Sequence, residues 1–221
     1  METENARVLA WYQQFVQSTK SRRRVKHRDS NLNPVARFTL KDFLGTWYQV
    51  ATSRSTSLFN SGTGITNVQA TYGIDLNATA PGLEEPSPAL GAVQKNPVVT
   101  VVNTGTGPNG QVFTVKGTSV ARDMDVLTCR TVTFPTTNPY GPPKPPGNYW
   151  IVYITEDRNT IIIGAPLIVE DCIVHANFGL YILTKKARET YWADGRLVQE
   201  INDVCRKYGY TKCWNEPVRT D

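Results

Sequence analysis

From residue 38 onward, the chain alternates between short runs of β-type residues and clusters of Gly, Pro and Asn. Runs of about four to eight residues in which apolar and polar side chains alternate are typical of strands with one buried face. The pattern predicts eight strands, at residues 46–53, 66–76, 98–103, 111–120, 125–134, 148–155, 160–164 and 180–185. Eight short strands separated by turn residues favour an antiparallel barrel or sandwich over a sheet with helical crossovers.

Apolar residues near the two ends of the chain recur at helical rather than strand spacing. The first stripe comprises Val8, Trp11, Tyr12, Phe15 and Val16. The second runs from Trp192 to Cys205 and stops before Gly209. The first predicted helix could pack on its own domain, bind a partner or lie on a membrane surface. We therefore expect an amphipathic helix and basic arm at 1–30, a barrel with a C-terminal helix at 31–215, and a tail at 216–221.

Three segments between the predicted strands differ from simple turns. Residues 80–88 and 135–147 are rich in proline, which excludes them from the interior of a sheet, and we expect both to be loops. Residues 168–179 have no clear period. They form either a long loop over the barrel or a segment that contains a short ninth strand.

The net charge of +5 originates in one short basic arm. Its six cations are Lys20, Arg22, Arg23, Arg24, Lys26 and Arg28, and without them the rest of the chain carries a charge of −1. Such an arm can bind an anionic membrane or an acidic protein, or it is a solvated linker. The arm holds no aromatic residue to stack on bases, so sequence-specific binding of nucleic acid is not expected.

Few side chains are available for catalysis or metal binding. The two histidines are His27 and His175, and the spacing of the four cysteines matches no zinc site. The glycine-rich sequence at 105–110 resembles a dinucleotide-binding loop, but a strand pattern follows it where such a loop requires a helix. We interpret it as a hairpin loop, and we expect no enzymatic activity, no cofactor and no metal.

The first residues of the chain are polar and lack the apolar stretch of a secretory signal peptide. We therefore expect an intracellular protein whose thiols are mostly reduced. The cysteines concerned are Cys129, Cys172, Cys205 and Cys213. No apolar run approaches the roughly 20 residues that a transmembrane helix needs.

Several motifs resemble those of the lipocalin family. FLGTWYQVA at 43–51 resembles the opening Gly-x-Trp motif, NYWIVYITED at 148–157 the second motif, and LYILTK at 180–185 the third. The runs at 66–72, 161–166 and 207–210 resemble the bacterial, plant and apolipoprotein D-like branch. The resemblance implies an all-β fold, an eight-stranded antiparallel up-and-down barrel with a C-terminal α-helix, to which this chain adds an N-terminal helix.

The resemblance also implies how one end of the barrel is closed. Gly45 permits the tight turn into the first strand, and Trp47 fills the narrow end of the barrel with its ring. In the family an arginine covers this ring at the position that matches Lys185. Because lysine stacks less well than arginine, we expect a weaker cation–π contact here.

Alternation along the first and sixth strands predicts the lining of an internal cavity. The candidate ligand-binding residues are Trp47, Gln49 and Ala51 on one face of the first strand, and Trp150, Val152 and Ile154 on one face of the sixth. A cavity with these walls suits a fatty acid, a lysolipid or a similar hydrophobic molecule.

Two functions remain open at this point. In the first, an intracellular barrel binds a small hydrophobic ligand, with or without attachment to a membrane surface. In the second, side chains fill the barrel, and the protein is a structural subunit of a larger complex, such as an organelle complex or a virion. Residues 1–30 would then dock the barrel into the assembly.

Overall fold

The computed structural model describes residues 38–53, 65–75, 98–121, 129–134, 147–169, 172–212 and 215–220. The predicted N-terminal helix, the basic arm and nearly all of the two proline-rich segments lie outside these residues. No helix within the described ranges is long and apolar enough to cross a membrane.

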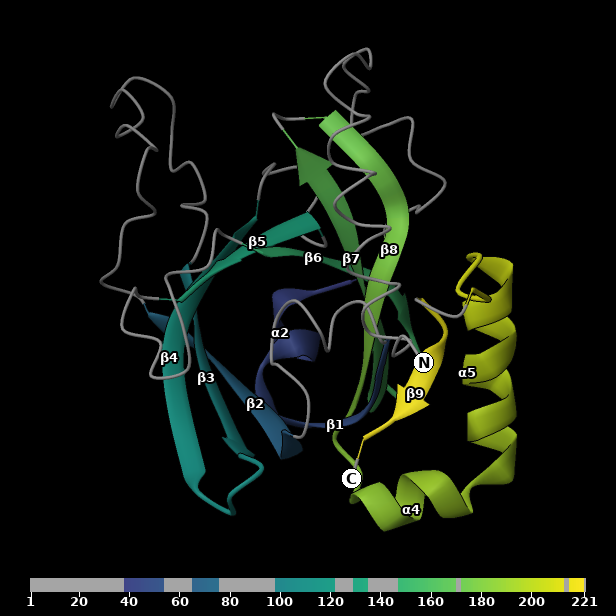
Figure 1. Ribbon diagram of the computed structural model, residues 1–221, viewed down its shortest axis with the longest axis horizontal. Coiled ribbons are helices and arrows are strands. Elements are labelled where there is room, and N and C mark those ends of the chain that lie inside the picture. The colour runs from purple at the N-terminus through teal and green to yellow at the C-terminus, as the bar shows by residue number, and fades with distance from the viewer. Residues whose placement is uncertain are drawn as a thin grey trace, which may run out of the picture.

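Eight antiparallel strands form a closed barrel (Figure 1). They are β1 (Gly45–Ser53), β2 (Thr66–Asp75), β3 (Val98–Thr106), β4 (Val112–Ala121), β5 (Cys129–Thr133), β6 (Gly147–Ile154), β7 (Thr160–Val169) and β8 (Cys172–Thr184). Each strand from β2 to β7 pairs with the next, and β1 pairs with both β2 and β8, which closes the sheet. The predicted up-and-down barrel is therefore confirmed.

The segment at 168–179, for which the sequence left two interpretations, belongs to the hairpin between β7 and β8. Leu167 is the register partner of His175, and Val169 is the partner of Cys172. Both interpretations were wrong, because the segment is neither a long loop nor a ninth strand. Its polar residues obscure the apolar pattern by which the remainder of these two strands was found.

A ninth strand does occur at the C-terminus, where we expected only a tail. β9 (Pro217–Arg219) pairs antiparallel with the second half of β1, from Ala51 to Ser53. The first half of the same β1 edge, from Gly45 to Tyr48, pairs with β2. The ladder between β1 and β2 is therefore short, and β9 takes its place along the rest of the edge.

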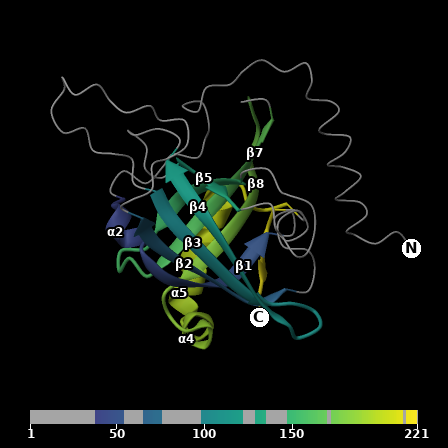
Figure 2. The same ribbon diagram turned by 90° about the vertical axis from the view of Figure 1, so that its left-hand side faces the viewer.

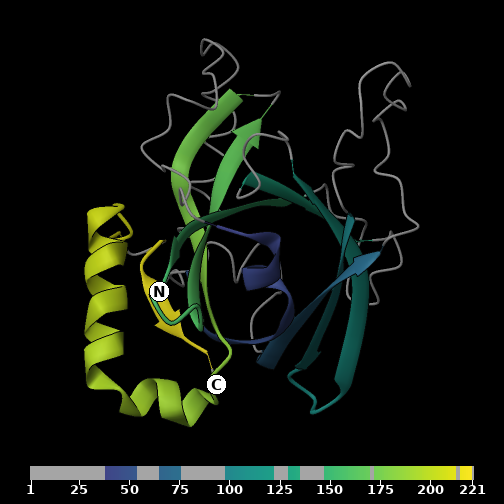
Figure 3. The ribbon, with the colours of Figure 1, turned by 180° about the vertical axis from the view of Figure 1, so that it is seen from behind.

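Three helices accompany the described strands: α2 (Leu40–Phe43), α4 (Arg188–Ala193) and α5 (Gly195–Lys207). The predicted C-terminal helix is α5. Asp194 is its N-cap residue, and the Oδ1 atom of Asp194 accepts a hydrogen bond from the Leu197 amide. The helix ends before Gly209, which has a φ of +78°. Figures 1 and 3 show α5 outside the barrel, beside β8 and β9.

Two hydrophobic clusters lie on the two faces of the barrel wall. The outer cluster joins the wall to α4 and α5 and includes Trp150, Ile162, Leu180, Tyr191 and Ile201. The inner cluster fills much of the barrel interior and includes Phe43, Trp47, Tyr72, Ile151 and Leu183. Because α5 covers one side of the barrel, the strands under it carry apolar residues on both faces.

The turn between β6 and β7 is stabilised by Asp157. Its Oδ1 accepts hydrogen bonds from the Thr155 hydroxyl (2.7 Å) and the Asn159 amide (3.0 Å), and Lys186 Nζ lies 3.3 Å from Oδ2. Burial acts to raise the pKa of Asp157, but these contacts outweigh it and lower the pKa to about 2.

Asp157→Asn is therefore expected to reduce the free energy of unfolding by about 0.5–1 kcal/mol at pH 7, a small effect because the side chain is nearly half exposed. The folded-state pKa lies below the unfolded value, so the contribution of the carboxylate is present above pH ~4 and is lost as the pH falls towards 2. Urea denaturation of both proteins at pH 7 and at pH 2.5 measures this. A pH-independent difference would contradict the assignment, and the adjacent Glu156→Gln is the control.

Candidate functional site

One end of the barrel is closed by Trp47 and α2. Gly45 enters β1 with a φ of +100°, a conformation that side chains other than glycine rarely adopt. Trp47 follows two residues later and is fully buried, with its indole Nε1 donating to the Phe43 carbonyl at 2.8 Å. Lys185 Nζ lies 4.7 Å from the centroid of the Trp47 ring and donates to the Asp42 carbonyl at 3.1 Å. The lysine thus binds both the ring and the helix.

Asp42 attaches α2 to the surrounding turns. Its carboxylate accepts hydrogen bonds from the Thr39 amide and hydroxyl, and Arg158 from the β6–β7 turn lies 3.5 Å away. Burial acts to raise the pKa of Asp42, but the Thr39 hydrogen bonds and the charges of Arg158 and Lys185 lower it overall.

Figure 2 shows α2 at the barrel end opposite the hairpin between β3 and β4. We call the end that holds α2 the floor.

A column of aromatic rings rises from the floor into the barrel. Phe43 stacks on Tyr72 with ring centroids 3.9 Å apart, and the Tyr72 hydroxyl is hydrogen-bonded to the Tyr149 hydroxyl at 3.0 Å. The ring of Tyr149 lies 5.4 Å from that of Tyr181. Because β2 and β6 lie on opposite sides of the eight-stranded barrel, the hydrogen bond between Tyr72 and Tyr149 crosses its interior.

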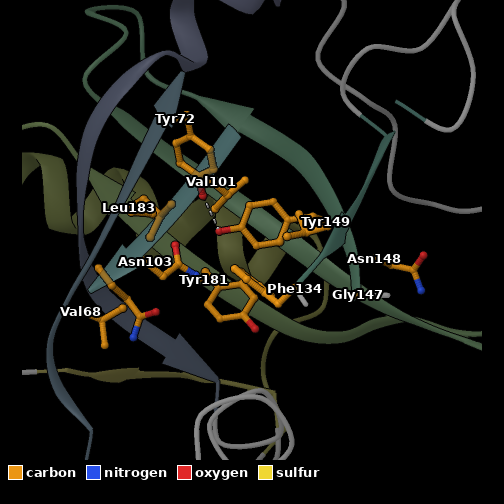
Figure 4. Close-up of a pocket in the computed structure, with 13 residues that line it drawn as sticks. Val68, Tyr72, Val101, Asn103, Phe134, Gly147, Asn148, Tyr149, Tyr181 and Leu183 are labelled. Atoms are coloured by element: carbon orange, nitrogen blue, oxygen red, sulfur yellow. Dashed lines mark hydrogen bonds between the residues drawn. The ribbon is translucent and has the colours of Figure 1, made fainter. Parts of the chain in front are cut away.

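Beside this tyrosine pair lies a cavity of about 160 Å³ (Figure 4). Its lining consists of Gln49, Val68, Ala70, Tyr72, Val101, Asn103, Val132, Phe134, Gly147, Asn148, Tyr149, Tyr181 and Leu183. The cavity extends towards the start of β6, away from the floor. Most of its wall is aliphatic or aromatic, and the polar groups are tyrosine hydroxyls and side-chain amides. An apolar cavity of about 150 Å³ is large enough to bind benzene.

Arg130 is fully buried in the barrel wall next to the tyrosine pair. It is the register partner of Tyr149, and it donates from Nε to the Ser119 hydroxyl (2.8 Å) and from Nη2 to the Ser119 carbonyl (2.9 Å). Burial lowers the pKa of Arg130 to about 10, with Tyr72 acting in the opposite direction, and burial raises the pKa of Tyr72 and Tyr149. At neutral pH the arginine is therefore charged, and both tyrosines keep their protons.

The six candidate ligand-binding residues fall into two groups. Gln49 lines the cavity, whereas Trp47 and Ile154 belong to the inner cluster outside the cavity lining. The other three, Ala51, Trp150 and Val152, lie in the outer cluster against the helices. The expectation that those three face the interior was therefore wrong.

For Ala51 the cause of this error is a β-bulge, whereas for Trp150 and Val152 the wrong face of β6 was assigned to the cavity. Between Gln49 and Ala51 the register with β8 shifts by one residue, so Ala51 lies in the outer cluster although Gln49 faces inward. A similar shift between Ile151 and Tyr153 moves Ile154 to the face opposite that of Val152. A strict two-residue period cannot be continued through such a bulge.

Four interior residues escaped the sequence analysis: Tyr72, Asn103, Arg130 and Tyr149. Tyr149 is adjacent to Trp150, so choosing the opposite face of β6 would have found it. The buried arginine gave no comparable signal, because an arginine in a strand is usually on the solvent face.

Arg188 of α4 joins β1 and β2 at the point where their ladder stops. Its guanidinium donates to the Gln49 carbonyl (3.1 Å), the Val68 carbonyl (2.6 Å) and Asn67 Oδ1 (3.1 Å). Gln49 and Val68 both line the cavity. The arginine therefore holds together the part of the wall where backbone hydrogen bonds between the two strands are missing.

The basic arm and the cysteines are the other residues that the sequence singled out. The six cations of the basic arm, between residues 20 and 28, lie outside the described residues. Cys129 and Cys205 are buried in the outer cluster, and burial raises the pKa of the Cys205 thiol to about 12. This thiol is therefore protonated and unreactive at neutral pH.

No protein-family model matches the chain, and no curated protein matches it. Among solved structures, lobster apocrustacyanin A1 superimposes with a TM-score of 0.51 at 12% identity, over 82% of this chain and 78% of that one. Apocrustacyanin C2 gives 0.51 and 12%, over 81% and 77%. Japanin from Rhipicephalus appendiculatus, bound to cholesterol, gives 0.39 and 14%, over 80% and 91%. The likeness to the apocrustacyanins shows the fold alone: an eight-stranded antiparallel barrel of the lipocalin type with a C-terminal helix.

Proposed function

We propose that the barrel binds a small, largely apolar molecule in the cavity beside Tyr72 and Tyr149, without making or breaking covalent bonds. The observation that supports this most directly is the cavity itself, about 160 Å³ inside a barrel whose floor is closed by Trp47. Aliphatic side chains and rings form most of its wall. Each methylene group of a ligand buried there contributes about 0.8 kcal/mol to binding.

The size of the cavity narrows the range of ligands. Pockets for drug-sized molecules usually measure about 300–1,000 Å³. The space enclosed by the described residues is smaller, and it suits a single ring or a short aliphatic chain. We therefore favour a small aromatic molecule or a short fatty acid over a lysolipid or a sterol.

Ala70→Leu is expected to weaken binding of a benzene-sized probe such as toluene at least tenfold. Ala70 lines the cavity and is almost fully buried, so a larger side chain there occupies the space of the ligand. Toluene titration followed by amide chemical shifts measures the affinity. Thr71→Leu is the matched control, because Thr71 is the next residue of β2 and is exposed.

The outcome of this titration separates the two functions that the sequence left open. If toluene and other benzene-sized apolar probes leave the spectrum of the folded wild-type protein unchanged, the binding function is wrong and a structural role is favoured. That role, with docking through residues 1–30, rests on residues outside the described ranges and stays a prediction. The intracellular location and the bacterial, plant and apolipoprotein D-like branch also stay predictions.

A further inference from the structure

The tyrosine pair in the barrel has one proton more than its own hydrogen bond uses. Two hydroxyl groups carry two protons, and one hydrogen bond between Tyr72 and Tyr149 uses one of them. Neither hydroxyl has a second hydrogen-bond partner among the described residues. Since both residues line the cavity, the second proton is available to an acceptor placed there. Figure 4 shows the two hydroxyls meeting within the ring of lining residues.

The charge next to this pair is positive. Arg130 lies directly across the β5–β6 ladder from Tyr149, is fully buried, and acts electrostatically on Tyr72. In a buried environment the field of a guanidinium is screened far less than in water. None of the thirteen lining residues is an aspartate or glutamate that would repel an anion.

Asn103 supplies a second group without a partner. Its Oδ1 atom is buried and accepts no hydrogen bond from the described residues, and the side chain lines the cavity wall on β3. The oxygen and nitrogen of a side-chain amide can exchange places by rotation. Asn103 can therefore present an N–H to an acceptor bound between it and the tyrosines.

We propose that the cavity selects small apolar molecules with a carboxylate head group, which accepts a hydrogen bond from the Tyr72–Tyr149 pair in the positive field of Arg130. This inference rests on the proposed function and specifies its ligand class. The apolar body of the ligand would occupy the space between Ala70, Val101 and Leu183. A carboxylate bound there would accept a hydrogen bond from the tyrosine hydroxyl whose proton has no other acceptor among the described residues.

Benzoate, benzyl alcohol, benzylamine and toluene have nearly the same ring volume and differ in the head group, so they test the proposal. For the full-length wild-type protein at pH 7, we expect benzoate to bind at least ten times more tightly than benzyl alcohol, and benzylamine most weakly. Titration calorimetry, supported by amide chemical shifts, measures the affinities. In the double variant Tyr72→Phe/Tyr149→Phe the benzoate-to-benzyl alcohol affinity ratio should fall about tenfold, which corresponds to one charge-assisted hydrogen bond. Both hydroxyls must be removed, because a single variant leaves one hydroxyl whose proton is free to bind the carboxylate.

Tyr208→Phe is the matched control, because it removes a tyrosine hydroxyl at the C-terminal end of α5, outside the cavity. Its affinity ratio should equal that of the wild type. Arg130→Met should also reduce the ratio. If this variant fails to fold, as judged by circular dichroism, the double variant Tyr72→Phe/Tyr149→Phe still tests the proposal, since it leaves Arg130 in place.

Each result gives a decision. Benzyl alcohol or toluene binding as tightly as benzoate would overturn the carboxylate selection and leave the apolar-ligand function intact. An unchanged affinity ratio in the folded double variant Tyr72→Phe/Tyr149→Phe would overturn the role of the tyrosine pair. If none of the four probes binds, the proposed function fails and this inference fails with it.

Discussion

Trp47→Ala is expected to lower the free energy of unfolding by about 3–5 kcal/mol, the range measured for the removal of large aromatic rings from protein cores. The ring is fully buried at the floor of the barrel, so its loss leaves a cavity between α2 and the strands. The Phe43 carbonyl also loses the hydrogen bond from the indole. Equilibrium denaturation in urea measures the change.

The same denaturation experiment distinguishes the floor from the outer surface of the barrel. Trp192→Ala removes an identical ring from a partly buried site in the outer cluster, and we expect it to cost clearly less. Lys185→Met should cost about 1 kcal/mol, because it removes the cation over the Trp47 ring and the hydrogen bond to Asp42. A loss below about 1 kcal/mol for Trp47→Ala would show that the floor does not stabilise the barrel.

The second large effect is expected for Arg188→Ala, which should lower the free energy of unfolding by about 2–4 kcal/mol. Its guanidinium makes hydrogen bonds to Gln49, Val68 and Asn67 where the β1–β2 ladder has ended. Hydrogen bonds from charged donors contribute about 1.5–3 kcal/mol each, but neighbouring bonds are not additive and the site is partly exposed. Without them, the Val68 carbonyl loses its hydrogen bond from the guanidinium, and the Gln49 carbonyl retains the one from the Thr220 hydroxyl at 3.2 Å.

Arg188→Lys provides a sharper test of this geometry. A lysine keeps the charge, but its ammonium lacks the planar guanidinium that binds two carbonyls and a side-chain amide at once. It should therefore recover less than half of the lost free energy of unfolding. Arg196→Ala, at an exposed position on α5, should change the stability by less than about 0.5 kcal/mol. Full recovery by lysine would show that only the charge of Arg188 matters.

Arg188→Ala should also affect the cavity, because Gln49 and Val68 line it. Faster hydrogen exchange at the amides of residues 49–51 and 66–68, measured under native conditions, would report opening of the wall between β1 and β2. Unchanged exchange together with a large loss of global stability would place the effect of Arg188 elsewhere in the fold.

The sequence determined those features that depend on neighbouring residues. Alternating apolar residues and turn residues defined all eight barrel strands, although the lengths of β7 and β8 were underestimated. Helical spacing and Gly209 defined α5 and its end. The motif with Gly45 and Trp47 indicated the closed end of the barrel. The positive φ at Gly45 and the large buried ring of Trp47 each depend on the residue at that one position.

Only the tertiary structure decided which face of each strand meets the cavity and which groups meet inside it. β6 is apolar on both faces because α5 covers the outer one, so its period could not distinguish Trp150 from Tyr149. The bulges at Val50 and Val152 depend on pairing with β8 and β7. Tyr72 and Tyr149 are 77 positions apart along the chain and meet only because closure places β2 opposite β6. Side-chain periodicity is a property of one strand, whereas the cavity is formed between strands.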